Sequence, residues 1–299
     1  MYDDSNIFIL WLMHVLRSLR PEQWLKNIVV FAALIFSAQL TNVNSLILTA
    51  AGFCVFCMLS SAIYLFNDIC DRERDLNHPV KKLRPIASGA VSVSMAGTIA
   101  VILILIGLIS ALLINKTFLL AASCFLLLNI FYSLALKQIV IIDVMSIAMG
   151  FVIRAVAGGY AIKVHISPWL VLCTFLLALF LGLSKRRHEF ILLDQGASEH
   201  RKLLKEYSPY FLDQMISIVT TSTLILYILY TMLGELKVKM NVQNLELTIP
   251  FVLYGIFRYL YLVHKKSEGG SPARTFFHDP SLLINVILWS VVAIFLIYG

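Results

Sequence analysis

The sequence predicts an all-α, polytopic membrane protein with nine transmembrane helices and a cap on the cytoplasmic side. Two observations lead to this prediction. Of the 299 residues, 60% are hydrophobic and only 14% are charged, a balance far from that of a soluble domain. The apolar residues also gather into runs of about 20, the length of a helix that crosses a bilayer. No linker or separate soluble segment interrupts these runs, so residues 1–299 are expected to form one domain.

The nine predicted spans follow a short amphipathic lead-in at about residues 7–24. Arg17 and Arg20 lie in this lead-in before Pro21, as expected of a segment at the membrane interface. The first four residues lack the basic start of a secretory signal, so we expect the first span to be retained. The predicted spans are residues 26–40, 46–66, 92–115, 117–136, 139–162, 167–184, 213–234, 248–264 and 281–298.

The net charge of +7 is distributed unevenly between the two sides of the membrane. With the N-terminus inside, almost all lysines and arginines of the loops fall on the inner side. The outer loops receive only Lys116, Lys163, Lys237 and Lys239. The positive-inside rule therefore predicts a multi-pass protein of the plasma (inner) membrane with its active site on the cytoplasmic face. The short loops contain no nucleic-acid recognition module, so no nucleic-acid partner is expected. The predicted cap consists of the three longest polar stretches, 67–91, 185–212 and 264–280.

Acidic residues gather where the second span ends. On a helix Asp68, Asp71 and Asp75 fall at i, i+3 and i+7, so three carboxylates crowd one face and repel unless a cation lies among them. Hard cations such as Mg²⁺ take oxygen ligands and commonly bring substrate phosphates. The sequence therefore predicts that these three aspartates, assisted by Asn67, bind Mg²⁺ as the cofactor. The alternative is a solvated acidic helix end paired with its own arginines, but ionisable groups beside an apolar span usually have a function.

Basic residues accompany this acidic group. Lys81 and Arg84 follow it in the same loop, and we assign them to the phosphates of a donor. After the sixth span, Glu189 follows Lys185 by four residues and Arg186 by three, near enough on a helix to hold and orient both cations. This group is a candidate phosphate clamp, although topology alone also supplies cations at such helix ends.

The fifth predicted span contains two ionisable residues, Asp143 and Arg154. Eleven residues place them on a similar face but too far apart for a direct ion pair, so each is expected to face a polar cavity or another helix. For Arg154, an internal bridge to an acidic partner and contact with the substrate remain alternatives, and the same holds for Arg258 in the eighth span.

The motif Asn67-Asp68-x-x-Asp71-x-x-x-Asp75, in the second-to-third loop of a nine-helix membrane protein, resembles the first aspartate-rich motif of the UbiA superfamily of intramembrane prenyltransferases. The resemblance covers nearly the whole chain and implies helices arranged around a central cavity. Aromatic prenyltransferases of that superfamily carry a second aspartate-rich motif after the sixth helix. Here the segment from Lys185 to Glu189 stands in that place, and its cations suit a substrate that is itself an anion.

A narrower branch resembles the chain more closely: the polyprenyl-phosphate phosphoribosyltransferases, of which decaprenyl-phosphate phosphoribosyltransferase is the best-known member. The resemblance implies a glycosyltransferase that moves a phosphoribosyl group from phosphoribosyl diphosphate to a polyprenyl phosphate, releases diphosphate and supplies precursors of cell-envelope glycans. It implies Asp68, Asp71, Asp75 and Lys185 as catalytic residues and Lys26, Asn67, Lys81, Arg84, Tyr132, Lys137, Arg154, Arg186 and Glu189 as substrate-binding residues. The motifs that carry it are Arg20-Pro21-x-Gln23-Trp24-x-Lys26-Asn27, His78-Pro79-x-Lys81-x-x-Arg84-Pro85-Ile86-Ala87-x-Gly89, Tyr132-Ser133-x-x-Leu136-Lys137, Lys185-Arg186 with Glu189, and Asp279-Pro280.

Two alternatives remain. An ordinary UbiA-type enzyme would attach a prenyl chain to an aromatic acceptor, but it predicts a second carboxylate group that this chain lacks at the expected spacing. A membrane transporter would explain the apolar spans and buried charges, but it more often shows inverted repeats, and no clear repeat is seen. The sequence leaves open the polyprenyl chain length, the number of metal ions and the oligomeric state, a homo-oligomer included.

Overall fold

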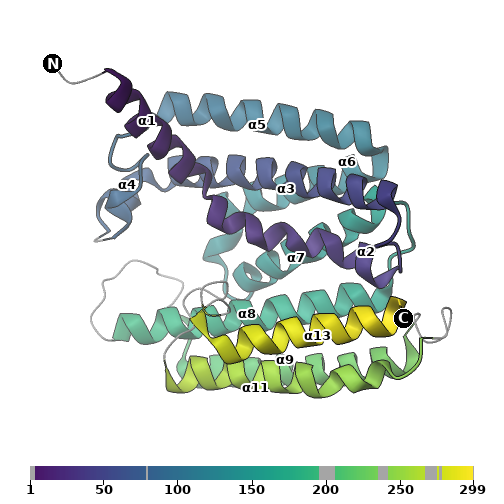
Figure 1. The fold of residues 1–299 in the computed structure, drawn as a ribbon. Coiled ribbons are helices and arrows are strands. Elements are labelled where there is room, and N and C mark those ends of the chain that lie inside the picture. Colours follow the sequence, from purple (N-terminus) through teal and green to yellow (C-terminus); the bar gives the residue numbers. More distant parts are fainter. Residues whose placement is uncertain are drawn as a thin grey trace.

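The structure is a computed structural model that describes residues 4–78, 80–194, 206–234, 242–266, 275 and 278–298. Within these residues every regular element is a helix (Figure 1). The elements are α1 (Asp4–Leu19), η1 (Pro21–Phe31), α2 (Ala32–Phe36), α3 (Val43–Cys70), α4 (Arg72–Leu76), η2 (Lys81–Leu83), α5 (Val93–Ile114), α6 (Lys116–Leu134), η3 (Leu136–Gln138), α7 (Ile142–Ala161), α8 (Pro168–Asp194), α9 (Pro209–Leu233), η5 (Leu245–Thr248), α11 (Ile249–Lys265) and α13 (Pro280–Tyr298).

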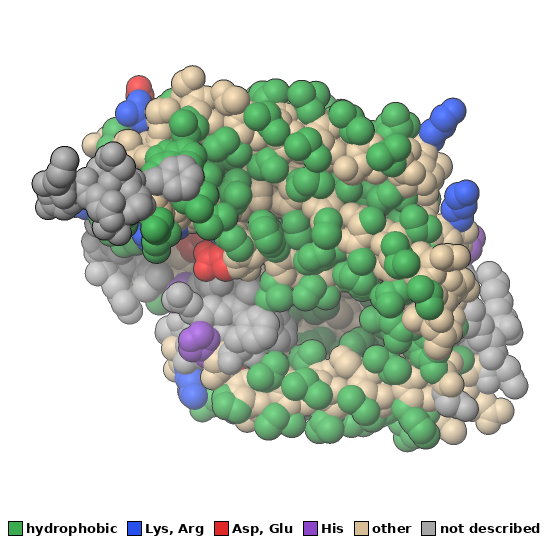
Figure 2. Space-filling view, turned by 45° about the horizontal axis from the view of Figure 1, so that its top comes forward, with side chains coloured by type: hydrophobic (Ala, Val, Ile, Leu, Met, Phe, Trp, Pro, Cys, Tyr) green, Lys and Arg blue, Asp and Glu red, His purple; other side chains and the backbone are tan. Residues whose placement is uncertain are grey.

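Eight helical segments in the described part of the chain are long and apolar enough to cross a membrane: α3, α5, α6, α7, α8, α9, η5 with α11, and α13. They coincide with eight of the nine predicted spans. Figure 2 shows hydrophobic side chains over most of one face of the molecule, with lysines and arginines toward its two ends. The chain is therefore an integral membrane protein.

The first predicted span, residues 26–40, differs from the expected single α-helix. It forms the 3₁₀ helix η1 followed by the short α2. In a 3₁₀ helix side chains three residues apart align, and here Trp24, Asn27 and Val30 all turn toward α3 or α7. Trp24 donates to Ser61 Oγ, Asn27 contacts α3 and α7, and Val30 is fully buried. These tertiary contacts at a spacing of three outweigh the preference of an apolar run for an α-helix.

The predicted cytoplasmic cap lies only partly within the described residues. Of its three stretches, residues 67–91 form α4, η2 and the turns around them. Much of 185–212 and 264–280 lies outside the described residues, but α8 continues as a helix to Asp194. The predicted clamp of Lys185, Arg186 and Glu189 therefore lies on the last turns of α8.

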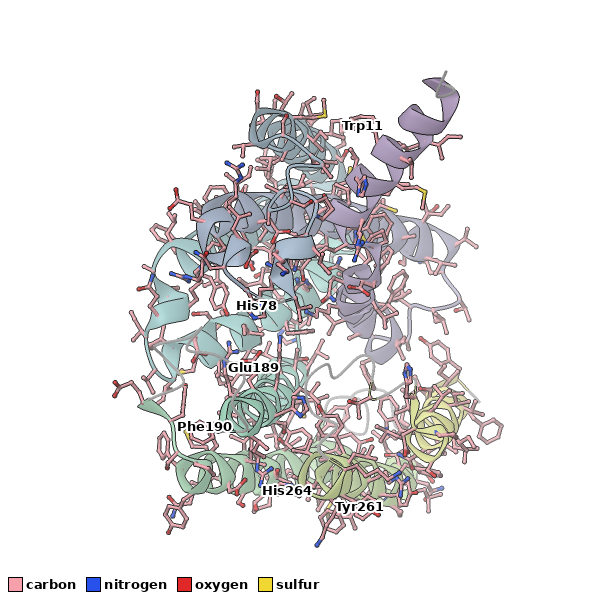
Figure 3. The ribbon with its side chains drawn as sticks, turned by 90° about the vertical axis from the view of Figure 1, so that its left-hand side faces the viewer. Trp11, His78, Glu189, Phe190, Tyr261 and His264 are labelled. Carbon is pink, nitrogen blue, oxygen red and sulfur yellow. The ribbon has the colours of Figure 1, made fainter. Side chains whose placement is uncertain are left out.

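The long helices form two layers, visible from the side in Figure 1 and from one end in Figure 3. The first layer contains α3, α5, α6 and α7, with η1 and α2 packed on α3 and α7. The second contains α8, α9, α11 and α13, and the packing of α7 against α8 joins the two layers. The amphipathic lead-in contains α1, which packs on α3 through buried Val15 and exposes Ile9, Leu10 and Met13 on its other side.

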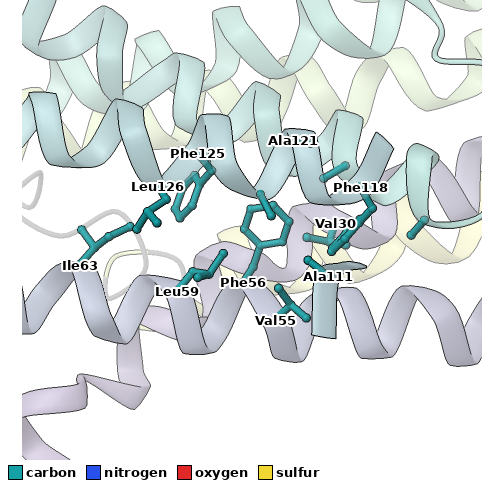
Figure 4. Packing of buried hydrophobic residues seen from close by; sticks show 13 residues of the cluster. Val30, Val55, Phe56, Leu59, Ile63, Ala111, Phe118, Ala121, Phe125 and Leu126 are labelled. Atoms are coloured by element: carbon teal, nitrogen blue, oxygen red, sulfur yellow. The ribbon is translucent and has the colours of Figure 1, made fainter. Parts of the chain in front are cut away.

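The core of the first layer is built from aromatic rings. Phe56 of α3 meets Phe118 and Phe125 of α6 edge to face, with ring centroids 5.8 and 5.1 Å apart (Figure 4). A separate cluster in the second layer centres on Phe180 of α8 and Tyr259 of α11. Each layer is thus built around an apolar cluster, and Val144 of α7 also packs into the cluster of the second layer.

Close packing of η1 on α7 depends on one glycine. A Cβ atom placed on Gly158 would lie 1.9 Å from the Val30 carbonyl oxygen, a distance at which backbone atoms have to move. Gly158 therefore sets how closely η1 approaches α7.

The substitution Gly158→Ala is expected to destabilise the protein by about 1–3 kcal/mol, because η1 has to shift to relieve the overlap. The measurement is thermal unfolding of the purified protein in detergent. Gly97→Ala in α5 is the matched control: nothing lies within 4 Å of its added Cβ, so a gain of about 0.5–1 kcal/mol from the better helix former is expected. Equal melting temperatures for the two variants would contradict this account of the η1–α7 contact.

Candidate active site

The predicted acidic residues lie where α3 ends. The helix stops at Cys70, Asp71 occupies its C-cap, and α4 begins at Arg72. Asp68 therefore belongs to α3, Asp71 to the junction and Asp75 to α4, instead of one continuous helical face. The backbone N–H of Asp75 still donates to the Asp71 carbonyl at 2.8 Å, so the chain stays tightly wound and the carboxylates remain together. Asn67 and the three aspartates are named the aspartate cluster below.

Two arginines from elsewhere in the chain neutralise the buried part of this cluster. Arg20 donates to Asp68 Oδ1 at 2.6 Å. Arg84 Nη1 donates to Asp75 Oδ2 at 2.6 Å and to Asp68 Oδ1 at 3.2 Å. Both carboxylates are almost fully buried, where a charge requires a partner. The neighbouring Arg74 contributes only a long contact, 3.7 Å from Asp71.

Lys137, from η3 at the end of α6, neutralises the other half of the cluster. Its Nζ lies 2.8 and 2.9 Å from the two carboxylate oxygens of Asp71 and 3.4 Å from Asn67 Oδ1. The sequence places these residues 66 and 70 positions apart, so only the fold brings them together.

The donor atoms of the aspartate cluster fit a hard cation that arrives with an anionic substrate. All of them are oxygens, and two positive groups already stand where oxygens of different residues converge: Arg84 on Asp68 and Asp75, Lys137 on Asn67 and Asp71. In the described ranges no three acidic, histidine or cysteine side chains form a metal site by themselves. Mg²⁺ typically takes only one or two carboxylates and completes its shell with phosphates and water, which matches this arrangement.

The last turns of α8 contain a second group, Tyr132 of α6 with Lys185, Arg186 and Glu189, named the α8 cluster. Arg186 is only 3% exposed. It donates through Nε to Asp143 Oδ2 at 2.6 Å and through Nη1 to Glu189, and Tyr132 OH lies 3.5 Å from its Nη2. Two carboxylates thus occupy the guanidinium that was predicted to bind a phosphate. Lys185, whose side chain is 43% exposed and 3.7 Å from Glu189, is the more accessible cation.

Asp143 is held by a residue that sequence analysis did not find. Tyr207 donates its hydroxyl to Asp143 Oδ1 at 2.9 Å and accepts from the Ile141 N–H at 2.7 Å. Burial raises the pKa of Tyr207 to about 12, so the hydroxyl keeps its proton as a donor. The prediction that Asp143 faces another helix is confirmed by its contact with Arg186. No spacing signal in the sequence points to Tyr207, which lies 64 positions away.

The two intramembrane arginines differ. Arg258 forms a bidentate pair with Asp279, at 3.1 and 2.7 Å, and this hydrogen bonding lowers the pKa of the Asp279 carboxyl. Arg154 instead donates to Asn27 Oδ1 at 2.7 Å and to the Gly150 carbonyl at 3.0 Å. The internal-bridge interpretation therefore holds for Arg258, while the contacts of Arg154 are with neutral groups.

Tyr64 marks the place where these groups meet. It lies within electrostatic range of Asp68, Arg154 and Lys185, and Arg20 stacks on its ring at 5.0 Å. Tyr64 was not predicted, although its position four residues before Asp68 puts both on one face of α3. Of the remaining predicted residues, Lys26 lies on η1 within electrostatic range of Arg154 and Arg20, and Lys81 begins η2.

A largely apolar cavity of about 750 Å³ lies between the two layers. One wall is formed by α2 and by the part of η1 that follows Lys26, and the opposite wall by α8, α9, α11 and α13. Its lining includes Ile28, Phe31, Trp169, Leu177, Tyr230 and Trp289. The polar groups around Tyr64 and the apolar cavity therefore share η1 as a boundary.

Comparisons with known proteins agree with these features. The model of the UbiA prenyltransferase family matches residues 27–279. The decaprenyl-phosphate phosphoribosyltransferase of Corynebacterium glutamicum is 32% identical over 95% of this chain and 86% of its own, and that of Mycobacterium tuberculosis is 32% identical over 71% and 72%. A UbiA homolog from Archaeoglobus fulgidus bound to GPP and Mg²⁺ has the same fold, with a TM-score of 0.73 and 19% identity over 96% of this chain and 100% of its own. The resemblance inferred from the motifs, to this superfamily and its phosphoribosyltransferase branch, is confirmed.

Arg186 is expected to stabilise the fold, whereas the neighbouring Lys185 is not. Arg186→Met leaves Asp143 and Glu189 without their buried counter-charge, so a loss of about 3–5 kcal/mol is expected in thermal unfolding. Lys185→Met, the matched control one position earlier (Figure 3 labels Glu189 on the same helix), is expected to change stability by no more than about 0.5 kcal/mol. Unchanged melting of Arg186→Met together with a large loss of substrate affinity would instead assign Arg186 to the substrate.

Proposed function

The chain belongs to the UbiA prenyltransferase family, and from that premise we propose that it transfers a 5-phosphoribosyl group from phosphoribosyl diphosphate to a polyprenyl phosphate. Diphosphate is the second product, and Mg²⁺ is the cofactor. Relatives that are 32% identical are named decaprenyl-phosphate phosphoribosyltransferase, which supports the transferred phosphoribosyl group and the class of acceptor. The product is a precursor for cell-envelope glycans.

The observation that carries the proposal is the character of the α8 cluster. An enzyme that activates a prenyl diphosphate with a second metal site needs free carboxylates at this end of α8. Here Glu189 and Asp143 are both bound to Arg186, and Lys185 is the exposed group. Cations on this side of the site suit two anionic substrates, a sugar diphosphate and a lipid phosphate.

Asn67, Asp68, Asp71 and Asp75 are proposed to hold Mg²⁺, which supplies positive charge against the diphosphate leaving group. Arg84, together with Lys81 of the adjacent η2, is placed to contact the phosphates of the donor. Lys137 approaches the same oxygens from α6. These side chains fix the donor before the reaction, so that positioning and electrostatic stabilisation account for most of the rate.

The acceptor needs no strong general base, because a phosphate monoester is already an anion at neutral pH. As the bond to diphosphate lengthens, the ribose acquires oxocarbenium character, and the acceptor oxygen attacks its anomeric carbon from the opposite side. In-line displacement converts an α-linked donor into a β-linked product. Tyr207, Asp143, Arg186 and Glu189 form a continuous chain of contacts that orients Lys185 beside the reacting groups.

The same proposal includes the arrangement in the membrane. The end that carries the aspartate cluster faces the cytosol, which is where a phosphorylated sugar donor is available, and the positive-inside rule supports this orientation for the plasma membrane. We assign η1 and α2 to the remaining crossing of the nine, which is the first along the chain. The polyprenyl chain occupies the apolar cavity between the layers, whose wall begins next to Lys26.

Replacing one carboxylate tests the metal assignment. Asp71→Asn keeps the size of the side chain but removes its charge, so a loss of transfer of about 100-fold or more is expected. The assay measures label moved from phosphoribosyl diphosphate to polyprenyl phosphate by purified protein in detergent, with Mg²⁺ and again with EDTA. Glu73→Gln, an exposed carboxylate of α4 outside the cluster, is the matched control and should retain activity.

Two results would count against the proposal. Near-normal, Mg²⁺-dependent transfer by Asp71→Asn would refute the metal assignment. A wild-type protein that forms no labelled lipid from phosphoribosyl diphosphate, yet attaches a prenyl group to an aromatic acceptor, would refute the assigned reaction itself.

A further inference from the structure

Arg154 is a buried cation whose hydrogen bonds are with neutral groups. It lies in the middle of α7 and is only 7% exposed. Besides Asn27 and the Gly150 carbonyl, its guanidinium contacts the rings of Phe125 and Phe151, at 4.3 and 5.3 Å from the ring centroids. Among the described residues no acidic oxygen lies within 4 Å of it. An isolated buried charge is costly, and inside a membrane it marks a functional group.

Lys26 adds a second positive charge beside it. This side chain is half-buried and makes no hydrogen bond or ion pair with the described residues. The positive charges of Arg154 and Arg20 repel that of Lys26. The acidic group that attracts it is Glu22, an exposed residue one turn earlier. Two cations held together in an interior of low dielectric repel each other. An anion between Lys26 and Arg154 would remove this repulsion.

The two cations are held in place by contacts that need no ligand. Asn27, next to Lys26, accepts from both Arg154 and Ser60, and Trp24 donates to Ser61. Gly158, one turn beyond Arg154, allows the backbone of η1 to lie against α7. Contacts of this kind fix η1 relative to α7 in advance, which lowers the cost of ordering a bound group.

The position of these cations identifies their ligand. Ser60, which bonds Asn27, lies about 12 Å from Asp68 along α3, so the cations are deeper in the bundle than the aspartate cluster. In the opposite direction, Ile28 and Val29 line the apolar cavity. A group bound here has the donor site on one side and an apolar cavity on the other. A phosphate at the head of a long hydrocarbon chain fits both neighbours.

We propose that Lys26 and Arg154 bind the phosphate of the acceptor lipid, with the hydrocarbon chain in the apolar cavity. The assignment rests on the proposed function and adds to it a division of the site: donor phosphates at the aspartate cluster, acceptor phosphate at Lys26 and Arg154. The pair then determines specificity, because an uncharged polyprenol leaves both cations without a counter-charge.

The test measures binding of labelled polyprenyl phosphate to the purified full-length protein in detergent, without any donor. Lys26→Met and Arg154→Met are each expected to weaken binding by about tenfold or more, whereas Lys26→Arg keeps the charge and should stay near the wild type. Unlabelled polyprenyl phosphate should compete, and polyprenol of the same length should not. Lys116→Met, an exposed lysine at the opposite end of the bundle, is the matched control.

Steady-state kinetics and melting separate this role from the alternatives. For both methionine variants the KM for polyprenyl phosphate is expected to rise by about tenfold or more, with the KM for phosphoribosyl diphosphate nearly unchanged. Arg154→Met should melt no lower than the wild type, because it removes an uncompensated buried charge.

Two results would overturn the assignment, and a third would separate it from the proposed function. A rise in the donor KM with unchanged lipid binding would overturn the assignment and give these cations to the 5-phosphate of the donor. Unchanged lipid binding in Lys26→Met combined with a lower melting temperature of Arg154→Met would overturn it in favour of a structural role. Charge-dependent lipid binding by a protein that transfers nothing from phosphoribosyl diphosphate would support the lipid site and refute the proposed function.

Discussion

The need to neutralise charge inside an apolar bundle organises this end of the molecule. Asp68 is paired with Arg20, Asp71 with Lys137, and Asp143 with Arg186. Each pair joins separate elements: η1 to α3, the end of α6 to the end of α3, and α7 to α8. Because a buried charge without a partner is costly, helices that slide or separate here lose more than apolar contact. The Asp143–Arg186 pair therefore links the two layers, and the other two pairs fix the elements of the first layer around the aspartate cluster.

Apolar periodicity predicts most of this fold, since eight predicted spans coincide with long helices. The exception is residues 26–40, where hydrophobicity indicates a membrane crossing. It cannot reveal that η1 is a 3₁₀ helix, because that geometry depends on the contacts of Trp24, Asn27 and Val30 with α3 and α7. The site residues also separate into those that the sequence predicts and those that only the fold reveals. Local spacing finds the aspartate cluster and the link from Arg186 to Glu189. It cannot find the partners Lys137, Asp143 and Tyr207, because their pairings depend on how separate helices pack.

Pairing also explains why an acidic site can exist before any metal arrives. Arg84 and Lys137 supply the positive charge that the aspartate cluster requires. In the proposed reaction the aspartate cluster would hold Mg²⁺, which would supply positive charge there, and Arg84 and Lys137 would lie beside the phosphates of the donor.

Arg20 has three structural roles, and no other amino acid could fill all of them. Its backbone has φ 52°, a left-handed conformation that favours glycine, where α1 ends and η1 begins. Its side chain also pairs with Asp68 and stacks on Tyr64. Glycine would relieve the backbone but abandon the carboxylate, and lysine would keep a charge but lose the flat face that stacks. Natural variation should therefore be narrower at this bend between surface helix and membrane bundle than at either of the helices it connects.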